Sequence, residues 1–228
     1  MGRIFESSRI GELVDVSAVK ADAAQGEIDE MIRIVRQYDC ICAAPMAWAA
    51  SYTVEALKGS NAVVTGVVGF PSGGELSQSK AEEAKALIGL GCQEIDMVMN
   101  IGAFKSGNYD LVRDDIRTVI DAVSGIPVKV ILEIAYLTED EICRGSELLV
   151  KAGAAYVKTG SGWGPKPTTV ETIRLIRGTI GDGAKIKAAG GVRDLKTLSA
   201  MYEAGCDRFG LGVRTAETIL QEALGHGK

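Results

Sequence analysis

Histidine is nearly absent from this 228-residue chain, whose single histidine is His226, two residues from the end. A histidine-based catalytic triad or a histidine-rich metal site is therefore excluded on composition. The five cysteines are odd in number and scattered among apolar residues, which favours reduced thiols over a disulfide framework. Cys40 and Cys42 have the wrong spacing for a zinc knuckle, and no second pair completes one. We predict no metal and a cytoplasmic location.

The sequence also lacks a basic excess and a long apolar run. Its net charge is −5 and its pI about 5.1, so no basic surplus draws it to a phosphate backbone. No apolar run reaches the roughly 18 residues of a membrane-spanning helix, and the chain does not start with a charged-then-apolar leader. We expect no nucleic-acid or membrane partner. The apolar content of 46% suits a soluble protein with a sizeable core.

Short apolar segments alternate with amphipathic segments from end to end. The spacing of Ile28, Met31, Ile32 and Val35, for example, predicts a helix. We predict eight strand-then-helix units, whose strands fall within residues 12–19, 39–44, 62–70, 94–102, 127–135, 154–160, 184–191 and 207–212.

Regular alternation of this kind predicts a parallel sheet joined by right-handed crossovers. Eight units in this length favour an α/β fold of the closed (β/α)8 TIM barrel type, typically about 250 residues long, and an open doubly wound sheet is the alternative. No linker or change in composition interrupts the pattern. We therefore assign residues 1–228 to one domain.

Charged side chains stand at the carboxyl ends of several predicted strands, where barrel enzymes carry their active sites. Lys158 and Lys187 each precede a glycine-rich turn on adjacent strands, and alternation places Asp96 and Glu133 on the faces of two others. Buried charges of this kind are costly unless they are paired. Internal salt bridges, or lysines that point outward, are therefore the structural alternative to a catalytic site.

The two lysines favour the catalytic interpretation. Neighbouring ammonium groups depress one another's pKa, and desolvation adds to the effect. An ordinary lysine, with a pKa of about 10.4, is neutral in roughly one molecule in 2,500 at pH 7. A pKa of roughly 7–8 raises that fraction several-hundredfold. Lys158 and Lys187 thus indicate an imine-forming amine with an electrostatic partner.

Glycine-rich turns follow the seventh and eighth predicted strands, "AAGGVRD" and "FGLGVRTAE". Backbone amides at helix starts in these two places commonly bind phosphate in barrels. Arg193, Arg214 and Lys166 are candidates to add positive charge.

Three separated motifs, "VKTGSG", "KAAGGVR" and "EIDMVMNIG", together resemble the deoxyribose-phosphate aldolase family. The likeness continues through "VVGFPSG" and "VKVILE" and covers nearly the whole chain in the same order. The resemblance implies a (β/α)8 class I aldolase without metal or organic cofactor. Such an enzyme reversibly cleaves 2-deoxy-D-ribose 5-phosphate to D-glyceraldehyde 3-phosphate and acetaldehyde, so its partners are a sugar phosphate and an aldehyde.

By this resemblance, Lys158 matches the Schiff-base lysine, Lys187 the lysine that perturbs it, and Asp96 the acid that relays protons through water. The substrate-binding positions implied are Asp15, Ser17, Cys42 and Glu133. The phosphate-binding positions implied are Gly162, Gly190, Gly191, Gly210, Gly212 and Arg214.

The chain departs from the family pattern in three motifs, of which "CAAPMAWAAS" is smaller and more apolar than the family's usual stretch. "DVSAV" lacks the histidine of the family's Asp-His-Thr signature. Gly212 and Val213 stand where phosphate-binding serines usually follow the glycine, so Arg214 is the candidate replacement and an acceptor without phosphate is the alternative. A lysine aldolase with another carbonyl substrate, and a non-catalytic sugar-phosphate-binding barrel, are the competing functions. Trp48 and Met46 are candidates for a homodimer contact, with a core helix as the alternative.

Overall fold

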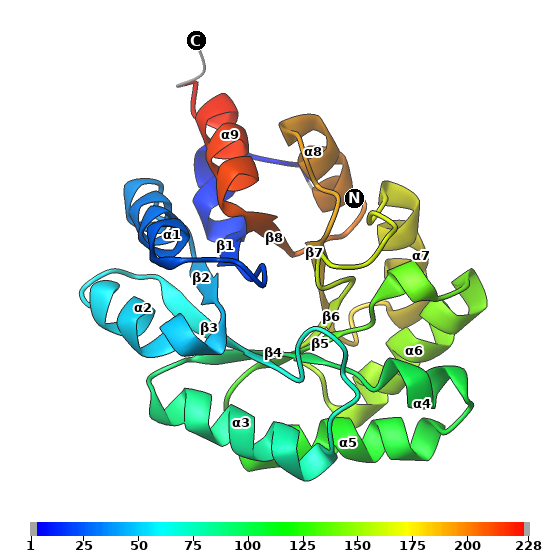
Figure 1. Ribbon diagram of the computed structural model, residues 1–228. Coiled ribbons are helices and arrows are strands. Elements are labelled where there is room, and N and C mark those ends of the chain that lie inside the picture. The colour runs from blue at the N-terminus through cyan, green and yellow to red at the C-terminus, as the bar shows by residue number, and fades with distance from the viewer. Residues whose placement is uncertain (1–3, 226–228) are drawn as a thin grey trace.

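The computed structural model describes residues 4–225, and its strands close into a single barrel (Figure 1). All eight strands are parallel and follow the chain order, and β8 pairs with β1 through Gly210 and Asp15 to complete the circle. They are β1 Val14–Ala18, β2 Cys42–Pro45, β3 Val63–Val68, β4 Glu94–Val98, β5 Val128–Ile131, β6 Tyr156–Lys158, β7 Lys185–Ala189 and β8 Arg208–Gly212. The predicted (β/α)8 barrel is confirmed, and the open sheet is wrong.

Helices form an outer ring around these strands (Figure 1). They are α1 Gln25–Gln37, α2 Ala50–Ala56, α3 Ser77–Gly89, α4 Ile101–Lys105, α5 Tyr109–Ala122, α6 Glu139–Ala152, α7 Val170–Ile180, α8 Leu195–Glu203 and α9 Val213–Ala223. Short 3-10 helices cover Ser7–Leu13 (η1), Ala47–Ala49 (η2) and Ile134–Tyr136 (η3). No helix in residues 4–225 is both long and apolar enough to span a membrane. The assignment of residues 1–228 to one domain stays a prediction.

Alternation along each strand separates an apolar layer from a polar one. Side chains such as Val16, Met97, Val157 and Ile186 face outward, are fully buried and pack beneath the helices. Burying each contributes about 1.5–3 kcal/mol. The intervening residues face the barrel interior, so the same alternation that builds the core gathers the charged side chains inside.

Local sequence sets where the helices begin and end. Thr138 and Glu141 form a reciprocal capping box at the start of α6, and Gly153 ends that helix with left-handed backbone, φ 96°. Asp194 accepts a hydrogen bond from the Thr197 amide at the start of α8. No side chain caps the start of α9. That uncapped end lies directly after β8, beside the barrel mouth.

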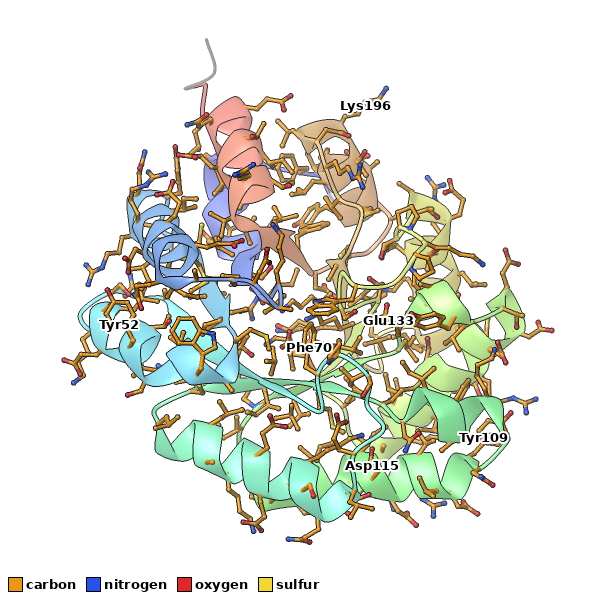
Figure 2. The ribbon with its side chains drawn as sticks, viewed as in Figure 1. Tyr52, Phe70, Tyr109, Asp115, Glu133 and Lys196 are labelled. Atoms are coloured by element: carbon orange, nitrogen blue, oxygen red, sulfur yellow. The ribbon has the colours of Figure 1, made fainter. Side chains whose placement is uncertain are left out.

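A buried ion pair ties the outer helices to the end of β4. Lys80 on α3 and Asp115 on α5 lie 2.7 Å apart and are both fully buried (Asp115 is labelled in Figure 2). Lys80 also donates a hydrogen bond of 3.1 Å to the Val98 carbonyl, at the last residue of β4. The pair therefore fixes the strand end that follows Asp96 by two residues.

The surface near η2 bears on the oligomeric state. Trp48 is 59% exposed and is not part of a core helix, whereas Met46 is partly buried beside it. A homodimer contact at this position stays a prediction. His226, in the C-terminal tail, lies outside the described residues.

Candidate active site

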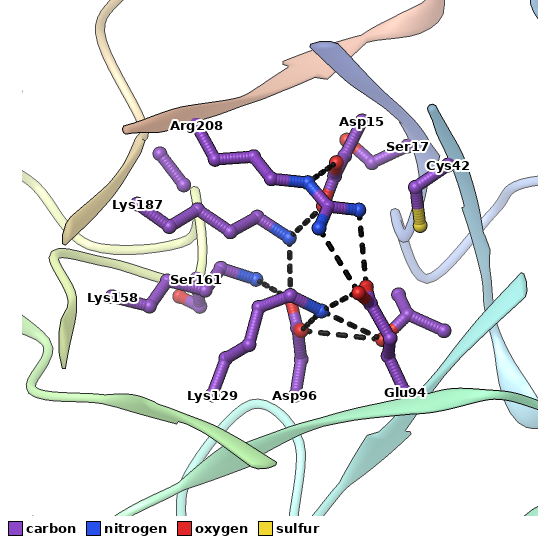
Figure 3. A network of polar contacts seen from close by, with 12 residues as sticks. Asp15, Ser17, Cys42, Glu94, Asp96, Lys129, Lys158, Ser161, Lys187 and Arg208 are labelled. Carbon is purple, nitrogen blue, oxygen red and sulfur yellow. Dashed lines mark hydrogen bonds and ion pairs between the residues drawn. The ribbon is translucent and has the colours of Figure 1, made fainter. Parts of the chain in front are cut away.

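The barrel interior holds a closed network of seven charged side chains (Figure 3). Four cations face three carboxylates: Lys129, Lys158, Lys187 and Arg208 against Asp15, Glu94 and Asp96. Strand register brings them together, since Lys158 pairs with Lys187 across β6 and β7, and Asp96 pairs with Lys129 across β4 and β5. Loss of one proton from a lysine would balance the charge of the cluster.

Asp96 stands at the centre of this network. One carboxylate oxygen, Oδ2, lies 2.6 Å from Lys158 Nζ and 2.7 Å from Lys187 Nζ, and Oδ1 lies 2.9 Å from Lys129 Nζ. Burial alone would raise the pKa of Asp96, but the three ammonium groups outweigh it and hold that pKa well below its usual range. Asp96 is therefore ionised at neutral pH and forms ion pairs with both Lys158 and Lys187, the two lysines predicted from the sequence.

Lys158 is the lysine that can lose its proton. Burial, first, and the nearby Lys187 ammonium, second, lower the pKa of Lys158 to about 8, against the opposing pull of Asp96. The residue is 7% exposed and lines a pocket, so a ligand in the pocket can reach its largely buried amine. An amine in this state is a nucleophile near neutral pH.

Lys187 has the opposite character. Burial works to lower its pKa, but Asp15 at 2.5 Å and Asp96 at 2.7 Å outweigh that effect, and the pKa of Lys187 is raised. Lys187 therefore stays cationic while Lys158 becomes neutral. The two lysines share one carboxylate oxygen, and of the two only Lys158 has a pKa low enough to lose its proton near neutral pH.

Arg208 forms ion pairs with Asp15 and Glu94 in the network, and the sequence pattern did not predict this role. Its Nε lies 2.6 Å from Asp15, and its two terminal nitrogens each lie 3.0 Å from one oxygen of Glu94. Lys129, which lies 2.6 Å from Glu94, closes the circuit to Asp96. The available clue was alternation, because Arg208 shares an interior face with Gly210 two residues later.

Two predicted substrate-binding residues, Asp15 and Cys42, are fully buried and do not line the pocket. Asp15 instead holds Lys187 and Arg208, so its role here is to position charge. The sulfur of Cys42 lies near the oxygens of Asp15 and Glu94. These three do not fit a divalent cation, because the guanidinium of Arg208 already occupies both carboxylates and burial raises the pKa of the Cys42 thiol.

A pocket of about 210 Å³ opens above Lys158 and Lys187. Most of the predicted phosphate positions do line it: Gly162, Gly190, Gly191, Gly210 and Gly212. Ser17 lines it as well, and its hydroxyl donates a hydrogen bond of 3.0 Å to the Leu211 carbonyl. The prediction of these residues around one cavity is consistent with the geometry.

Arg214 is the exception among the predicted phosphate positions. It lines an adjoining hollow beside α1 and α9 that also contains Glu30 and Glu217, and it does not line the lysine pocket itself. Alternation ends at Gly212, and α9 begins at Val213, so the helix turn carries Arg214 to the outer side. Arg193, which follows the glycine pair after β7, lines the lysine pocket in its place.

Glu133 also departs from its predicted position on the face of β5. The strand ends at Ile131, and Glu133 adopts a left-handed backbone, φ 54°, with its side chain against the loop after β6. Its carboxylate accepts hydrogen bonds from the Ser161 amide, at 3.0 Å, and from the Ser161 hydroxyl. Glu133 therefore holds the loop that follows Lys158, and it lies outside the lysine pocket.

We expect Arg208→Met to destabilise the fold by about 3–5 kcal/mol, because Asp15 and Glu94 would lose their shared cation while remaining buried. Urea unfolding followed by circular dichroism measures the change. The matched control is Arg9→Met, which removes an exposed arginine from a surface pair with Glu12 and should leave the midpoint unchanged. Equal midpoints for both variants would contradict a structural role for Arg208.

The sequence of this chain is similar to those of known aldolases. A deoxyribose-phosphate aldolase of Methanothermobacter thermautotrophicus is 45% identical over 202 residues, covering 88% of this chain and 90% of the relative. That of Klebsiella pneumoniae is 39% identical over 221 residues, covering 96% of this chain and 89% of the relative. The chain belongs to the deoxyribose-phosphate aldolase family. No family model matches it.

The fold of this chain is similar to that of solved aldolase structures. A crystal structure from Coccidioides immitis, assigned to deoxyribose-phosphate aldolase, superposes with a TM-score of 0.93 at 31% identity, over 97% of this chain and 88% of that one. The predicted family and barrel are therefore confirmed. The roles of individual aldolase residues remain predictions.

Proposed function

We propose that this chain is a class I aldolase that reversibly cleaves 2-deoxy-D-ribose 5-phosphate to D-glyceraldehyde 3-phosphate and acetaldehyde. The observation that carries the proposal is a lysine with a pKa of about 8, Lys158, at the base of a pocket and within 2.6 Å of a buried carboxylate. Membership of the deoxyribose-phosphate aldolase family supports the same substrate.

The depressed pKa matters because only the neutral amine attacks a carbonyl. With a pKa of about 8, roughly one Lys158 in ten is neutral at pH 7, whereas an ordinary lysine is neutral in roughly one molecule in 2,500. The fixed positive charge of Lys187 helps to hold Lys158 neutral, and Asp96 orients its nitrogen. The reactive amine is thus available before any substrate binds.

In the cleavage direction, Lys158 Nζ adds to C1 of the open-chain sugar to give a carbinolamine, which loses water to form an iminium ion. The C2–C3 bond then breaks. Its electron pair forms the enamine, and the proton of the C3 hydroxyl leaves as glyceraldehyde 3-phosphate is released. Protonation of the enamine at C2 and addition of water free acetaldehyde and return the amine. Each step needs a proton carrier close to Lys158 Nζ.

We infer that this carrier is a water molecule oriented by Asp96 and Lys187. Because the pKa of Asp96 is held well below its usual range, its carboxylate stays ionised. It accepts a hydrogen bond from the Lys158 amine and would orient the water through which protons pass. Lys187 donates to the same carboxylate oxygen and keeps the relay neutral overall. Removing either would impair transfer of the proton that leaves the attacking nitrogen and joins the departing hydroxyl as water.

The outer part of the pocket suits an anionic group. Gly190 and Gly191 have left-handed backbone, φ 82° and 96°, a conformation that favours glycine. Both residues line the pocket together with Gly212. The uncapped start of α9 and the guanidinium of Arg193 add positive potential there. We propose that this end binds the sugar phosphate, with backbone amides and Arg193 in place of serine hydroxyls.

We test the phosphate end by comparing 2-deoxyribose 5-phosphate with unphosphorylated 2-deoxyribose as substrates. Arg193→Met should lower the preference for the phosphorylated sugar roughly tenfold, mainly through KM, because one charge-assisted hydrogen bond is lost. Arg214→Met, outside the lysine pocket, is the matched control and should leave the preference unchanged. An effect of Arg214→Met equal to that of Arg193→Met would refute the assignment.

Two other functions give different outcomes when an imine on Lys158 is trapped by reduction with borohydride. A lysine aldolase for another carbonyl compound would form a trapped adduct with that compound and leave 2-deoxyribose 5-phosphate intact. A barrel that only binds sugar phosphates would bind the sugar without any adduct on Lys158. The pKa of about 8 at Lys158 favours turnover over binding alone, because a purely binding site gains nothing from a neutral amine.

A further inference from the structure

Trp163 stands at the mouth of the lysine pocket, in the loop between β6 and α7, five residues after Lys158. Its side chain is 46% exposed, while Lys158 below it is 7% exposed. The two residues therefore mark the outer and inner limits of one cavity. A large aromatic side chain in this position meets the part of a substrate farthest from the reacting nitrogen.

The indole is held in one orientation by contacts to two other loops. Its Nε1 donates a hydrogen bond of 3.0 Å to the Val19 carbonyl, in the loop after β1. Its ring packs edge-to-face against Phe70, in the loop after β3, with centroids 6.1 Å apart and planes at 89°. Figure 2 shows Phe70 over the centre of the barrel. Trp163 therefore joins the loops that follow three different strands.

The backbone beneath the indole is also fixed. The Trp163 amide donates 3.0 Å to the Ser161 hydroxyl, and Ser161 is held by the buried carboxylate of Glu133. A single exposed tryptophan is common on protein surfaces and does not require such contacts. Their combined effect is to keep a rigid apolar wall beside Val19, Lys20 and Arg193 at the pocket entrance.

We propose that Trp163 is a specificity-determining residue whose indole contacts the carbon chain of the acceptor aldehyde. This inference rests on the function proposed above. The occupant it fits is a short hydroxylated aldehyde, whose C–H side lies against the ring while its phosphate faces Arg193 and the glycine turns. The two-carbon donor, bound to Lys158 Nζ at the base of the pocket, does not reach the indole.

The division between donor and acceptor gives a direct test. Exchange of the methyl protons of acetaldehyde in D₂O, followed by NMR, reports imine and enamine formation at Lys158 alone. Cleavage of 2-deoxyribose 5-phosphate requires the acceptor half as well. We expect Trp163→Ala to raise KM for the sugar roughly tenfold while exchange of acetaldehyde changes by less than about twofold.

Two further variants separate the contacts of the indole. Trp163→Phe keeps an aromatic ring and loses the hydrogen bond to Val19, so its KM should fall between those of wild type and Trp163→Ala. Trp48→Phe changes the more exposed tryptophan on η2, which does not line the pocket, and should leave both reactions unchanged. A parallel loss of exchange and cleavage in Trp163→Ala would reduce Trp163 to a structural role and overturn the proposal, as would an unchanged KM.

Failure of the proposed function has a different signature. A wild-type protein that does not exchange acetaldehyde protons lacks enamine chemistry, whatever Trp163 does. Fluorescence then tests the contact itself, because the chain has only two tryptophans. In Trp48→Phe combined with Lys158→Met, all tryptophan emission comes from Trp163. Glyceraldehyde 3-phosphate should change that emission in a saturable manner, and no change at saturating aldehyde would overturn the proposal.

Discussion

Lys158→Met is expected to abolish cleavage of 2-deoxyribose 5-phosphate, with a loss on the order of 10⁴–10⁶-fold in kcat, as when other covalent enzymes lose their nucleophile. Methionine keeps most of the volume of the lysine side chain but has no amine, so no iminium ion forms. Asp96 retains Lys129 and Lys187 as partners in this variant, and we expect the barrel to fold normally. Coupled detection of glyceraldehyde 3-phosphate measures the loss.

The matched control for this variant is Lys185→Met, at the start of the neighbouring strand β7. Lys185 is exposed and stands two residues before Lys187 on the same strand face. Because it does not line the pocket, its replacement should leave turnover within about twofold of wild type. Substantial activity in Lys158→Met, with its fold intact, would remove Lys158 from the mechanism.

Lys187→Leu is the second variant with a large expected effect, and its effect depends on pH. In the wild type, Lys158 is protonated below its pKa of about 8, so kcat/KM should rise with pH up to that value and then level off. Lys187 is one of the groups that lower the pKa of Lys158, while Asp96 acts to raise it. Without the Lys187 charge, the pKa-raising effect of Asp96 on Lys158 is less opposed, so the pKa of Lys158 should rise. The rise in activity should therefore move to higher pH.

We also expect Lys187→Leu to reduce kcat on the order of 10²-fold or more at pH 7, since the proton relay through Asp96 loses its cation. Lys187→Arg retains a positive charge and serves as the control. It should keep the rise near its wild-type pH, even where the longer side chain lowers the rate. A pH profile in Lys187→Leu that matches wild type would exclude Lys187 from tuning Lys158.

Alternation along the strands was sufficient to predict which charged residues meet. Lys158 and Lys187 precede glycine-rich turns on neighbouring strands, and Asp96 alternates with apolar residues two strands away. Once eight units were assigned to a barrel, these three side chains had to face its interior near the carboxyl ends of the strands. The structure places Lys158 and Lys187 on the same oxygen of Asp96.

Other features depend on three-dimensional detail that a linear pattern does not carry. β5 ends at Ile131, two residues before Glu133, whose carboxylate contacts Ser161. Sequence alternation does not predict the left-handed backbone of Glu133 that allows this contact. Arg208 stands among residues that read as an ordinary buried strand, and its partners Asp15 and Glu94 come from distant parts of the chain. The orientation of Trp163 likewise depends on Val19, 144 residues away in sequence.

Borohydride trapping tests the central claim most directly. Wild-type protein is incubated with 2-deoxyribose 5-phosphate, reduced with sodium borohydride, and mapped by peptide mass spectrometry. We predict an ethyl group, the reduced two-carbon fragment of acetaldehyde, on Lys158 and on no other lysine of the network. An adduct on Lys129 or Lys187, or no adduct with this sugar, would contradict the account.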